Sequence, residues 1–309
     1  MARSRPAEIL VEGRTVILSH PDKILYPGEG ITKIDVVAYY ERVAPVMLPH
    51  LAGRPLTLLR HPEGIDQPGF FQKHPNHFPS WVETITMPKS SGGTSEAIVC
   101  EDAATLVYLA AHALEFHIRP ATVDDLAHPD LVVVDIDPPG PAPAPVLRRI
   151  ARLAGEVFRA IGLTPFVQAT GGRGFHVLAP LDRSAGFDAV RALAGDIASL
   201  LAASDPDLLT VQQRIDRRGG RIFLDVNRNG RGQTFAAPYT LRARPGAGVA
   251  TPLEWAELAR ATPAGHTIAS IPRRLARKAD PWVGLAADAG SALEARERLA
   301  GIRARVGLR

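Results

Sequence analysis

The segment 131–140, LVVVDIDPPG, constrains the fold of this chain more than any other stretch. Four apolar residues lead into Asp135-Ile136-Asp137 and two prolines close the run, which predicts a short buried β-strand over 131–137. Side chains alternate along a strand, so the two carboxylates leave on the same face. They repel each other and resist burial, and a divalent cation such as Mg²⁺ or Mn²⁺ relieves both problems. The other interpretation is an Asp pair that caps the strand end before a turn.

The residues that follow predict the sheet around this strand. The expected elements are a helix over 145–161, strands over 165–169 and 175–179, a helix over 187–203 and a strand over 221–226. The order β-α-β-β-α-β is the ferredoxin-like plan that RNA-recognition modules also use. In that plan the first and fourth strands are neighbours, which brings Asp225 onto the sheet beside Asp135 and Asp137. The register of the pairing is not readable from the sequence, so the three-carboxylate cluster is an inference from topology.

A glycine-rich turn, TGGRGFH over 170–176, joins two of the expected strands. It does not precede a helix and lacks the Gly-Lys-Ser/Thr of a Walker loop, which excludes an ATPase loop of that type. Glycines let backbone N–H groups approach a phosphate closely, and Arg173 and His176 add donors. Because the turn shares a sheet with the three aspartates, we interpret it as a phosphate-binding turn.

The first third of the chain predicts a second set of elements. They are a hairpin over 8–18, a helix over 34–47 capped by Thr32, a strand over 55–60, a hairpin from 82–87 and 97–99 with Lys89 at its tip, and an apolar helix over 103–117. The segment 233–244 adds another strand or pair, and the arginine-rich tail from about 271 ends in a charged helix that packs across one lobe. Histidines 112 and 117 fall near the end of the apolar helix, where packed or surface histidines are common.

Two features of this region suggest a nucleic-acid partner. Lys23 and Lys33 stand beside the start of the 34–47 helix, whose free N–H groups favour an anion. Phe70 and Phe71 lie in a polar loop, where adjacent aromatic side chains can stack on bases. The alternatives are that the two lysines are solvated and that the phenylalanines fill the core. Arginine supplies most of the basic residues of this chain, and a GC-rich genome alone would explain that bias.

Composition limits the classes of protein that remain. The chain has 309 residues, 46% of them hydrophobic, with a net charge of +4 and a pI near 9.4, which permits a nucleic-acid partner. No apolar run approaches ~18 residues and the N-terminus has no signal-peptide pattern, so we expect no membrane association. The single cysteine, Cys100, excludes an internal disulfide framework and a cysteine-rich zinc site. A cytoplasmic location follows as the expectation.

Taken together, the motifs resemble those of a known family. Asp-x-Asp, then Thr-Gly-x-x-Gly-x-His, then a lone Asp after an apolar strand, is the order of the archaeo-eukaryotic primase superfamily. The resemblance is closest to the polymerase domain of the bacterial end-joining ligase, the ligase D family, and its stand-alone relatives. It covers about residues 15–260 and includes the stretches HPDKILYP, GRPLTLLRHPEGID, GFFQKH, LEFH, DLVVVDIDPP, RGGRIFLDVNRN and APYTLRARP.

The resemblance implies an α+β primase-polymerase fold with a ferredoxin-like catalytic sheet and an N-terminal α/β lobe. We expect a single domain over 1–309. Its parts are a lobe at 1–118 for DNA-end and template contacts, a catalytic lobe at 119–265 and a basic helical tail at 266–309.

The resemblance also implies roles by position. The catalytic, metal-binding residues are Asp135, Asp137 and Asp225. The nucleotide-binding residues are His117, Thr170, Gly171, Arg173, His176, Arg218 and Arg242. Lys23 and Lys33 match the pair that grips a DNA 5′-phosphate, and Phe70 and Phe71 match the aromatics that stack on the template. The hairpin over 86–96 corresponds to a loop linked to the bridging of DNA ends.

The implied activity is template-directed nucleotidyl transfer with two Mn²⁺ or Mg²⁺ ions and NTP or dNTP substrates, including a readiness to insert ribonucleotides. The implied partners are gapped or broken duplex DNA with a 5′-phosphate, Ku and a separate DNA ligase. The protein is expected to be a bacterial, nucleoid-associated monomer that can pair across DNA ends. No Lys-x-Asp-Gly adenylation motif or histidine-rich phosphoesterase module occurs in the sequence, so ligation by this chain is not expected.

Two residues depart from the family pattern. Arg228 stands where the family usually has Gln, and Arg173 where it usually has Lys; both departures keep or add positive charge. Three other functions are alternatives. They are gap filling in excision repair, a non-catalytic DNA-end-binding module, and a metal-dependent phosphohydrolase. Carboxylates on the first strand disfavour the end-binding module, because they repel phosphates when no metal is bound, and the phenylalanine pair has no use in a phosphohydrolase.

Overall fold

The computed structural model describes residues 5–75, 77–88, 92–305 and 307. The chain forms two compact units. The first comprises Met1–Arg119, Phe235–Ala250 and His266–Ala279, and the second comprises Pro120–Thr234, Thr251–Gly265 and Asp280–Arg309. The expected parts at 1–118, 119–265 and 266–309 are consecutive, whereas these units exchange segments. The single-domain organisation and the roles of its three parts stay predictions.

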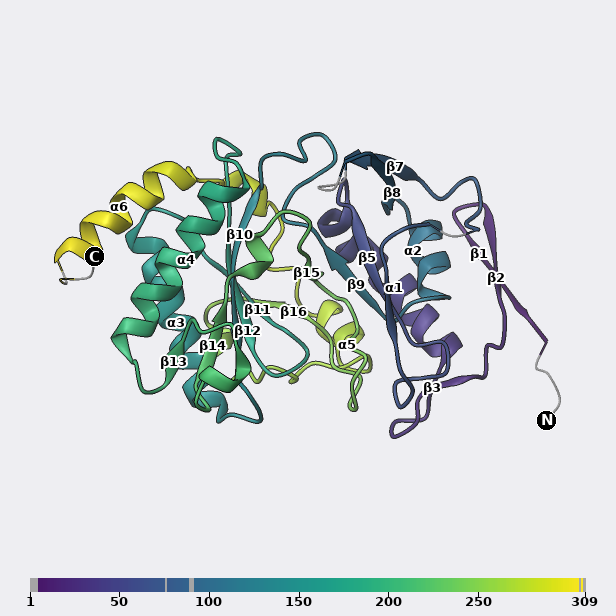
Figure 1. Cartoon of the computed structure of the whole chain (residues 1–309). Helices are drawn as coiled ribbons and strands as arrows, with labels where there is room; N and C mark the ends of the chain where they lie inside the picture. The colour runs from purple at the N-terminus through teal and green to yellow at the C-terminus, as the bar shows by residue number, and fades with distance from the viewer. Residues whose placement is uncertain (1–4, 76, 89–91, 306, 308–309) are drawn as a thin grey trace. The chain divides into compact units, whose positions relative to one another are not determined.

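A six-stranded sheet forms the second unit (Figure 1). Its order is β13 (Leu209–Thr210), β14 (Ile222–Asp225), β10 (Leu131–Asp137), β12 (Phe175–Pro180), β11 (Phe166–Ala169) and β16 (Thr251–Leu253). The four central strands have the predicted ferredoxin-like arrangement, with β14 beside β10. The sequence did not predict β13 and β16, which are two and three residues long and extend the sheet at its two edges.

Alternation along β10 separates a core face from a polar face. Val132, Val134 and Ile136 join the buried apolar cluster, which also includes residues of α3 (Ala144–Ala160) and α4 (Phe187–Ser204). Both helices therefore cover the same face of the sheet (Figure 1). The terminal helix α6 (Ala292–Arg305) packs on α4, as expected for a charged tail helix. The opposite face carries the aspartates.

The first unit contains a second sheet, in the order β15-β9-β5-β8-β7, with β6 paired to β5. The strands are β5 (Leu56–Arg60), β6 (Phe70–Gln72), β7 (Thr84–Pro88), β8 (Thr94–Ile98), β9 (Glu115–Ile118) and β15 (Phe235–Ala236). The hairpin β1 (Ala7–Val11) and β2 (Arg14–Leu18) and the pair β3 (Ile24–Tyr26) and β4 (Ile31–Thr32) complete its strands. The predicted hairpins over 8–18 and 82–99 are confirmed, but Lys89 at the second tip lies outside the described residues.

Helices α1 (Lys33–Leu51) and α2 (Ala103–Ala110) belong to the same unit and pack against each other. The predicted cap of α1 is confirmed, because the Thr32 side chain accepts from the Asp35 N–H and Asp35 bonds back to the Thr32 N–H. The short elements elsewhere are α5 (Ile271–Leu275), η1 (Ile215–Arg217), η2 (Asn227–Asn229), η3 (Glu257–Ala259) and η4 (Leu285–Asp288). Within the described residues, no helix is long and apolar enough to cross a bilayer.

Two local predictions were wrong. The helix expected over 103–117 ends at Ala110, and 115–118 is strand β9, paired with β5 and β15. Within the apolar run, the spacing of buried residues changes from that of a helix to that of a strand. Phe116 and Ile118 are buried, and His117 lies between them on the other face of the strand. The loop expected around Phe70 and Phe71 contains β6, which pairs with β5. The further strand expected within 233–244 is confirmed as the two-residue β15.

Candidate functional site

Strand pairing places the three aspartates on one face of the second unit's sheet. β10 and β14 run antiparallel with Asp135 directly opposite Asp225, and Asp137 lies two residues further along β10. Directly opposite residues share a face, and residues two apart on one strand share it too. The predicted adjacency of Asp225 to Asp135 and Asp137 is therefore confirmed.

Basic side chains surround these carboxylates. Arg228 lies 3.4 Å from Asp225 and 3.7 Å from Asp135, measured between guanidinium nitrogen and carboxylate oxygen. Arg173 lies 3.3 Å from Asp137, and Arg218 lies 3.9 Å from it. The acids thus meet counter-charges from three different segments of the second unit.

The pKa of Asp137 reflects its burial and the crowding of these acids. Burial and the nearby charge of Asp135 raise the pKa of Asp137, and Arg173 and Arg218 offset only part of the effect. A raised carboxyl pKa means that the ionised form is disfavoured where it stands. The pair therefore favours additional positive charge.

The donor chemistry of the three aspartates fits a divalent cation. Carboxylate oxygens are the ligands that Mg²⁺ and Mn²⁺ prefer, and three such groups share this face. Across residues 5–75, 77–88, 92–305 and 307, however, no group of three or more His, Cys, Asp or Glu side chains is gathered closely enough to hold an ion. The acids are aligned on the sheet, and their side chains are directed to arginines.

Asn229 fixes the segment that carries Arg228, and sequence reasoning missed this residue. Its buried side-chain amide accepts from the Val133 N–H at 2.8 Å and donates to the Val133 carbonyl at 2.7 Å. The Asn227 N–H donates to Asp225 at 2.8 Å. The pairing of β10 with β14 covers positions 135–137 of β10, and Asn229 takes up the polar backbone groups just before that stretch. An asparagine soon after a strand could have suggested this anchor.

The glycine-rich turn is tightly closed on itself. The Thr170 hydroxyl donates to the Gly174 carbonyl at 2.9 Å and accepts from the N–H groups of Gly172 and Gly174 at 3.3 Å. The Gly171 N–H donates to the Pro263 carbonyl at 2.8 Å. A Cβ on Gly174 would come within 1.7 Å of the Ile136 carbonyl oxygen, so only glycine lets the turn pass β10 this closely. Several of the amides expected to bind phosphate therefore already have partners inside the protein.

His176 and Arg218 complete the residues around the acids. His176 lies opposite Asp135 in the sheet, with its Nε2 3.6 Å from the Asp135 carboxylate, and its side chain is buried. Arg218 donates to the carbonyls of Gln212 and Gln213 at 3.1 and 3.0 Å, and its guanidinium lies over the Phe223 ring. Both side chains are held in place by the second unit itself.

Two other predicted nucleotide contacts, His117 and Arg242, meet in the first unit. Both bind the same buried carboxylate, Glu115: the His117 Nε2 lies at 2.9 Å and the Arg242 Nε at 3.0 Å. The Ala243 N–H donates to the other Glu115 oxygen at 2.7 Å. Burial alone would raise the pKa of Glu115, but His117, Arg242 and the Ala243 N–H together lower it to about 2. Sequence reasoning missed Glu115, although its position in LEFH placed it near His117.

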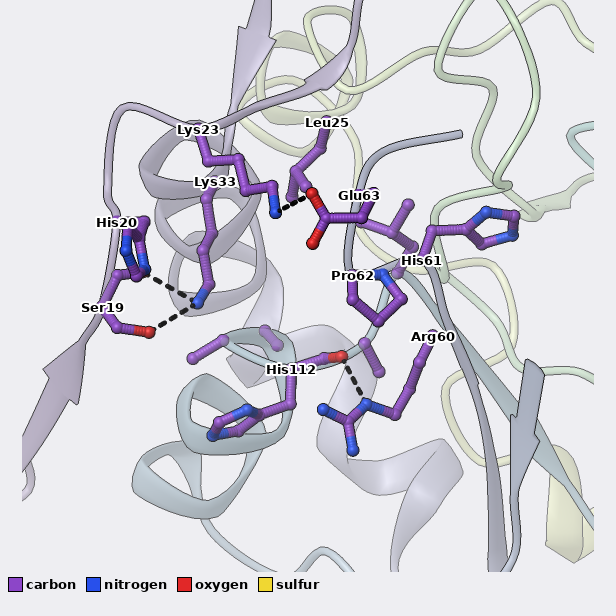
Figure 2. Close-up of a pocket in the computed structure, with 14 residues that line it drawn as sticks. Ser19, His20, Lys23, Leu25, Lys33, Arg60, His61, Pro62, Glu63 and His112 are labelled. Atoms are coloured by element: carbon purple, nitrogen blue, oxygen red, sulfur yellow. Dashed lines mark hydrogen bonds and ion pairs between the residues drawn. The ribbon is translucent and has the colours of Figure 1, made fainter. Parts of the chain in front are cut away.

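The predicted lysines line a pocket of the first unit, shown in Figure 2. Lys23 forms an ion pair with Glu63 at 2.7 Å, and the Lys33 ammonium donates to the Ser19 carbonyl at 3.0 Å. The helix N–H groups expected to be free are not, because the N–H of Lys33 donates to the Lys23 carbonyl and that of Ile34 to the Pro21 carbonyl. Those bonds bring the two lysines to the same pocket, so the positive charge there comes from side chains and not from these N–H groups.

Arg60 and His112 also line this pocket and were not predicted to belong to it. Burial, with repulsion from Lys23 and Arg60, lowers the pKa of Lys33. Burial, with the charges of Lys33 and Arg60, lowers the pKa of His112 to about 4. Burial also lowers the pKa of Arg60. Among the residues that line the pocket, Glu63 is the one carboxylate, so a bound anion would relieve the repulsion that Lys33 meets there.

Phe70 and Phe71 do not plug the core. They are 49% and 59% exposed, although both belong to a strand. The Arg60 guanidinium lies 5.4 Å from the Phe70 ring centre, and Phe71 meets the His117 ring edge-on at 5.6 Å. The exposed pair therefore connects the cationic pocket to the Glu115 cluster within the first unit.

The sheet, the three aligned aspartates and the glycine turn together define the architecture of a primase-polymerase domain. The family model described as "LigD, primase-polymerase domain" matches residues 32–282. This chain belongs to that family.

Individual relatives support the same conclusion. The chain is 35% identical over 284 residues to the multifunctional non-homologous end joining DNA repair protein LigD of Mycobacterium tuberculosis, covering 89% of this chain and 37% of the relative. It is 31% identical over 265 residues to the bifunctional non-homologous end joining protein LigD of Bacillus subtilis, covering 84% of this chain and 42% of the relative. The chain thus spans less than half the length of these curated relatives.

A solved structure is also similar. The polymerase domain from Mycobacterium tuberculosis ligase D, in complex with DNA, matches with a TM-score of 0.81 and 34% identity. The match covers 89% of this chain and 99% of that one. The predicted α+β primase-polymerase fold is confirmed.

The Glu115 cluster generates a pH-dependent stability prediction. The pKa of Glu115 falls from 4.5 to about 2 on folding, so its contribution is present above pH 4.5 and is lost as the pH falls toward 2. Replacing Glu115 with Gln should lower the free energy of unfolding at pH 7 by about 3 kcal/mol. Urea denaturation from pH 7 down to pH 3 should show the difference from wild type shrinking.

Glu41→Gln, at an exposed position of α1, is the control and should track the wild-type curve. A Glu115→Gln deficit that is the same at every pH would contradict the assigned ion pairs.

Proposed function

We propose that this domain is a template-directed nucleotidyltransferase that extends primers or fills short gaps at DNA breaks in bacterial non-homologous end joining. The observation that carries the proposal is the register that sets Asp135 opposite Asp225 with Asp137 on the same face. It occurs in a chain whose family model spans residues 32–282. The aligned acids supply what phosphoryl transfer needs most, a place to concentrate positive charge.

The residues that would hold two Mn²⁺ or Mg²⁺ ions are Asp135, Asp137 and Asp225. Such ions lower the pKa of a primer 3′-hydroxyl and stabilise the leaving pyrophosphate. Burial and the charge of Asp135 raise the pKa of Asp137, and a bound cation would offset both effects. The aspartates' own contribution is to keep three oxygen-donor groups on one rigid sheet.

The chain's cationic side chains then orient and stabilise the substrate triphosphate. In the second unit, Arg173, His176 and Arg218 lie around the acids, and Thr170 and Gly171 shape the adjoining turn. The nucleotide-binding role of His117 and Arg242 in the first unit is a separate part of the proposal, supported by Glu115, which holds both in one cluster. Fixed donors need little rearrangement when charge develops on the leaving group.

The first unit also supplies a proposed grip on DNA. The pocket with Lys23, Lys33 and Arg60 would take the 5′-phosphate on the far side of a gap, which displaces Glu63 from Lys23. Phe70 and Phe71 are exposed beside it and would stack on a template base, worth about 1–3 kcal/mol per base. The solved relative is a polymerase domain in complex with DNA, which supports DNA as the partner.

The wider biological setting is a proposal as well. Two relatives carry non-homologous end joining in their names, which favours that pathway over excision repair. We propose Ku and a separate DNA ligase as partners, a monomeric protein that pairs across DNA ends, and action on the bacterial nucleoid in the cytoplasm. A readiness to insert ribonucleotides belongs to the same proposal.

The first test is primer extension on a gapped duplex with Mn²⁺. Asp135→Ala should reduce extension by roughly 1,000-fold, because a lost metal ligand removes several kcal/mol of transition-state stabilisation. DNA binding should be retained, since the basic groups remain. Asp216→Ala, which removes an exposed partner of Arg214 in the same unit, should extend like wild type.

Substantial extension by the Asp135→Ala protein contradicts the proposal. Binding without extension by the wild type would instead indicate an end-binding module, and shortening of a labelled primer would indicate a hydrolase.

The second test concerns the 5′-phosphate pocket. Lys23→Ala should weaken binding to a gapped duplex with a 5′-phosphate by about five- to tenfold and reduce the salt dependence by about one ion. Its binding to the same duplex with a 5′-hydroxyl should change little. Lys278→Ala, outside the pocket, is the matched control. Equal losses on both duplexes would show that Lys23 does not recognise the phosphate.

A further inference from the structure

We propose that Arg228 is an internal counter-ion for Asp135 and Asp225 that a divalent cation displaces, so that this residue sets the affinity of the site for metal. The inference deepens the proposed function, because it rests on the same three aspartates as metal ligands. It concerns a residue of this chain that occupies the space between two of them.

The geometry shows one guanidinium shared by two carboxylates. The Arg228 Nη2 lies 3.4 Å from Asp225 Oδ2, and its Nε lies 3.7 Å from Asp135 Oδ2. The two aspartates face each other across the β10–β14 pair, so Arg228 bridges the strands where their acids meet. A single positive charge between two negative ones partly neutralises them, as a metal ion would.

The backbone beneath Arg228 is fixed. The next residue, Asn229, is fully buried and makes two hydrogen bonds to Val133 of β10, at 2.8 and 2.7 Å. The preceding residue, Asn227, donates its N–H to Asp225 at 2.8 Å. These bonds keep the base of the Arg228 side chain beside the acids, so its charge returns there whenever no other cation is present.

The side chain itself is only loosely held. Its contacts to the acids, at 3.4 and 3.7 Å, exceed the 2.7–2.9 Å of a strong charge-assisted hydrogen bond. The side chain is 38% exposed, and its remaining described bond, to the Thr234 carbonyl, is 3.4 Å long. Arg218, by contrast, is fixed by two backbone carbonyls at 3.1 and 3.0 Å and lies against Phe223. Arg228 can therefore turn into solvent, while Arg218 stays.

Competition follows from this arrangement. A cation that binds Asp135 and Asp225 must expel the guanidinium or share the carboxylates with a like charge, and both lower the apparent affinity. Partly exposed ion pairs contribute up to about 1 kcal/mol, which corresponds to about fivefold in affinity, and Arg228 makes two of them.

The test is a Mn²⁺ titration of the whole chain, with free Mn²⁺ measured by electron paramagnetic resonance and no nucleotide or DNA present. Arg228→Gln should bind Mn²⁺ about five- to tenfold more tightly than wild type. Arg228→Lys keeps the charge and should stay within about twofold of wild type. Arg214→Gln, an exposed arginine paired with Asp216, is the matched control and should not change.

Thermal unfolding gives a second readout, because a cation that binds only the folded chain raises its stability. The Mn²⁺-induced rise in Tm should be larger for Arg228→Gln than for wild type at the same concentration. An Arg228→Gln affinity equal to or weaker than wild type overturns the inference, as does tightening in Arg228→Lys equal to that in Arg228→Gln.

The metal-ligand role of Asp135 and the counter-ion role of Arg228 can be distinguished by experiment. If Asp135→Asn abolishes Mn²⁺ binding but Arg228→Gln leaves it unchanged, the counter-ion role is wrong and the metal ligands of the proposed function stand. If Asp135→Asn leaves Mn²⁺ binding intact, the ligand assignment is wrong, and the counter-ion role is overturned with it.

Discussion

The pairing of β10 with β14 is the constraint on which the second unit's chemistry depends. It brings Asp225, which is distant in sequence, beside Asp135 and Asp137 on one sheet face, with the apolar residues of the other face buried against two helices. Like charges so close together are unfavourable, and the protein compensates with arginines from three segments. The hydrophobic core under the sheet holds the acids in positions that their mutual repulsion alone would not allow.

In the second unit, arginines surround a group of carboxylates. In the first unit, single carboxylates lie among basic side chains. Around Glu115, one buried carboxylate binds both His117 and Arg242. In the lysine pocket, three cations converge on a space whose one carboxylate, Glu63, is largely exposed. In the proposed function, both clusters would present these side chains to phosphate groups.

Much of the fold and the alignment of the three aspartates could be predicted from the sequence, because the sequence patterns that specify them are local. The Val-rich run before Asp135, the capping Thr32 and the glycine turn each specify their structure within a few residues, and the β-α-β-β-α-β order then fixes the neighbour of β10. The run at 103–117 was predicted as one helix because buried helices and buried strands are both rich in apolar residues. Only the pairing of β9 with β5 shows where the helix ends and the strand begins. Asn229 and Glu115 escaped prediction because their partners, Val133 and Arg242, are distant in the chain. The free amides expected at the start of α1 were already bonded, which no local pattern reveals.

The measurement that tests the central claim most directly is anomalous diffraction from crystals of this protein grown with Mn²⁺ and a non-hydrolysable nucleoside triphosphate. We expect anomalous peaks that mark Mn²⁺ ions coordinated by oxygens of Asp135, Asp137 and Asp225. We expect the triphosphate beside the 170–176 turn. Manganese bound elsewhere, with these three carboxylates still directed to their arginines, would contradict the central claim.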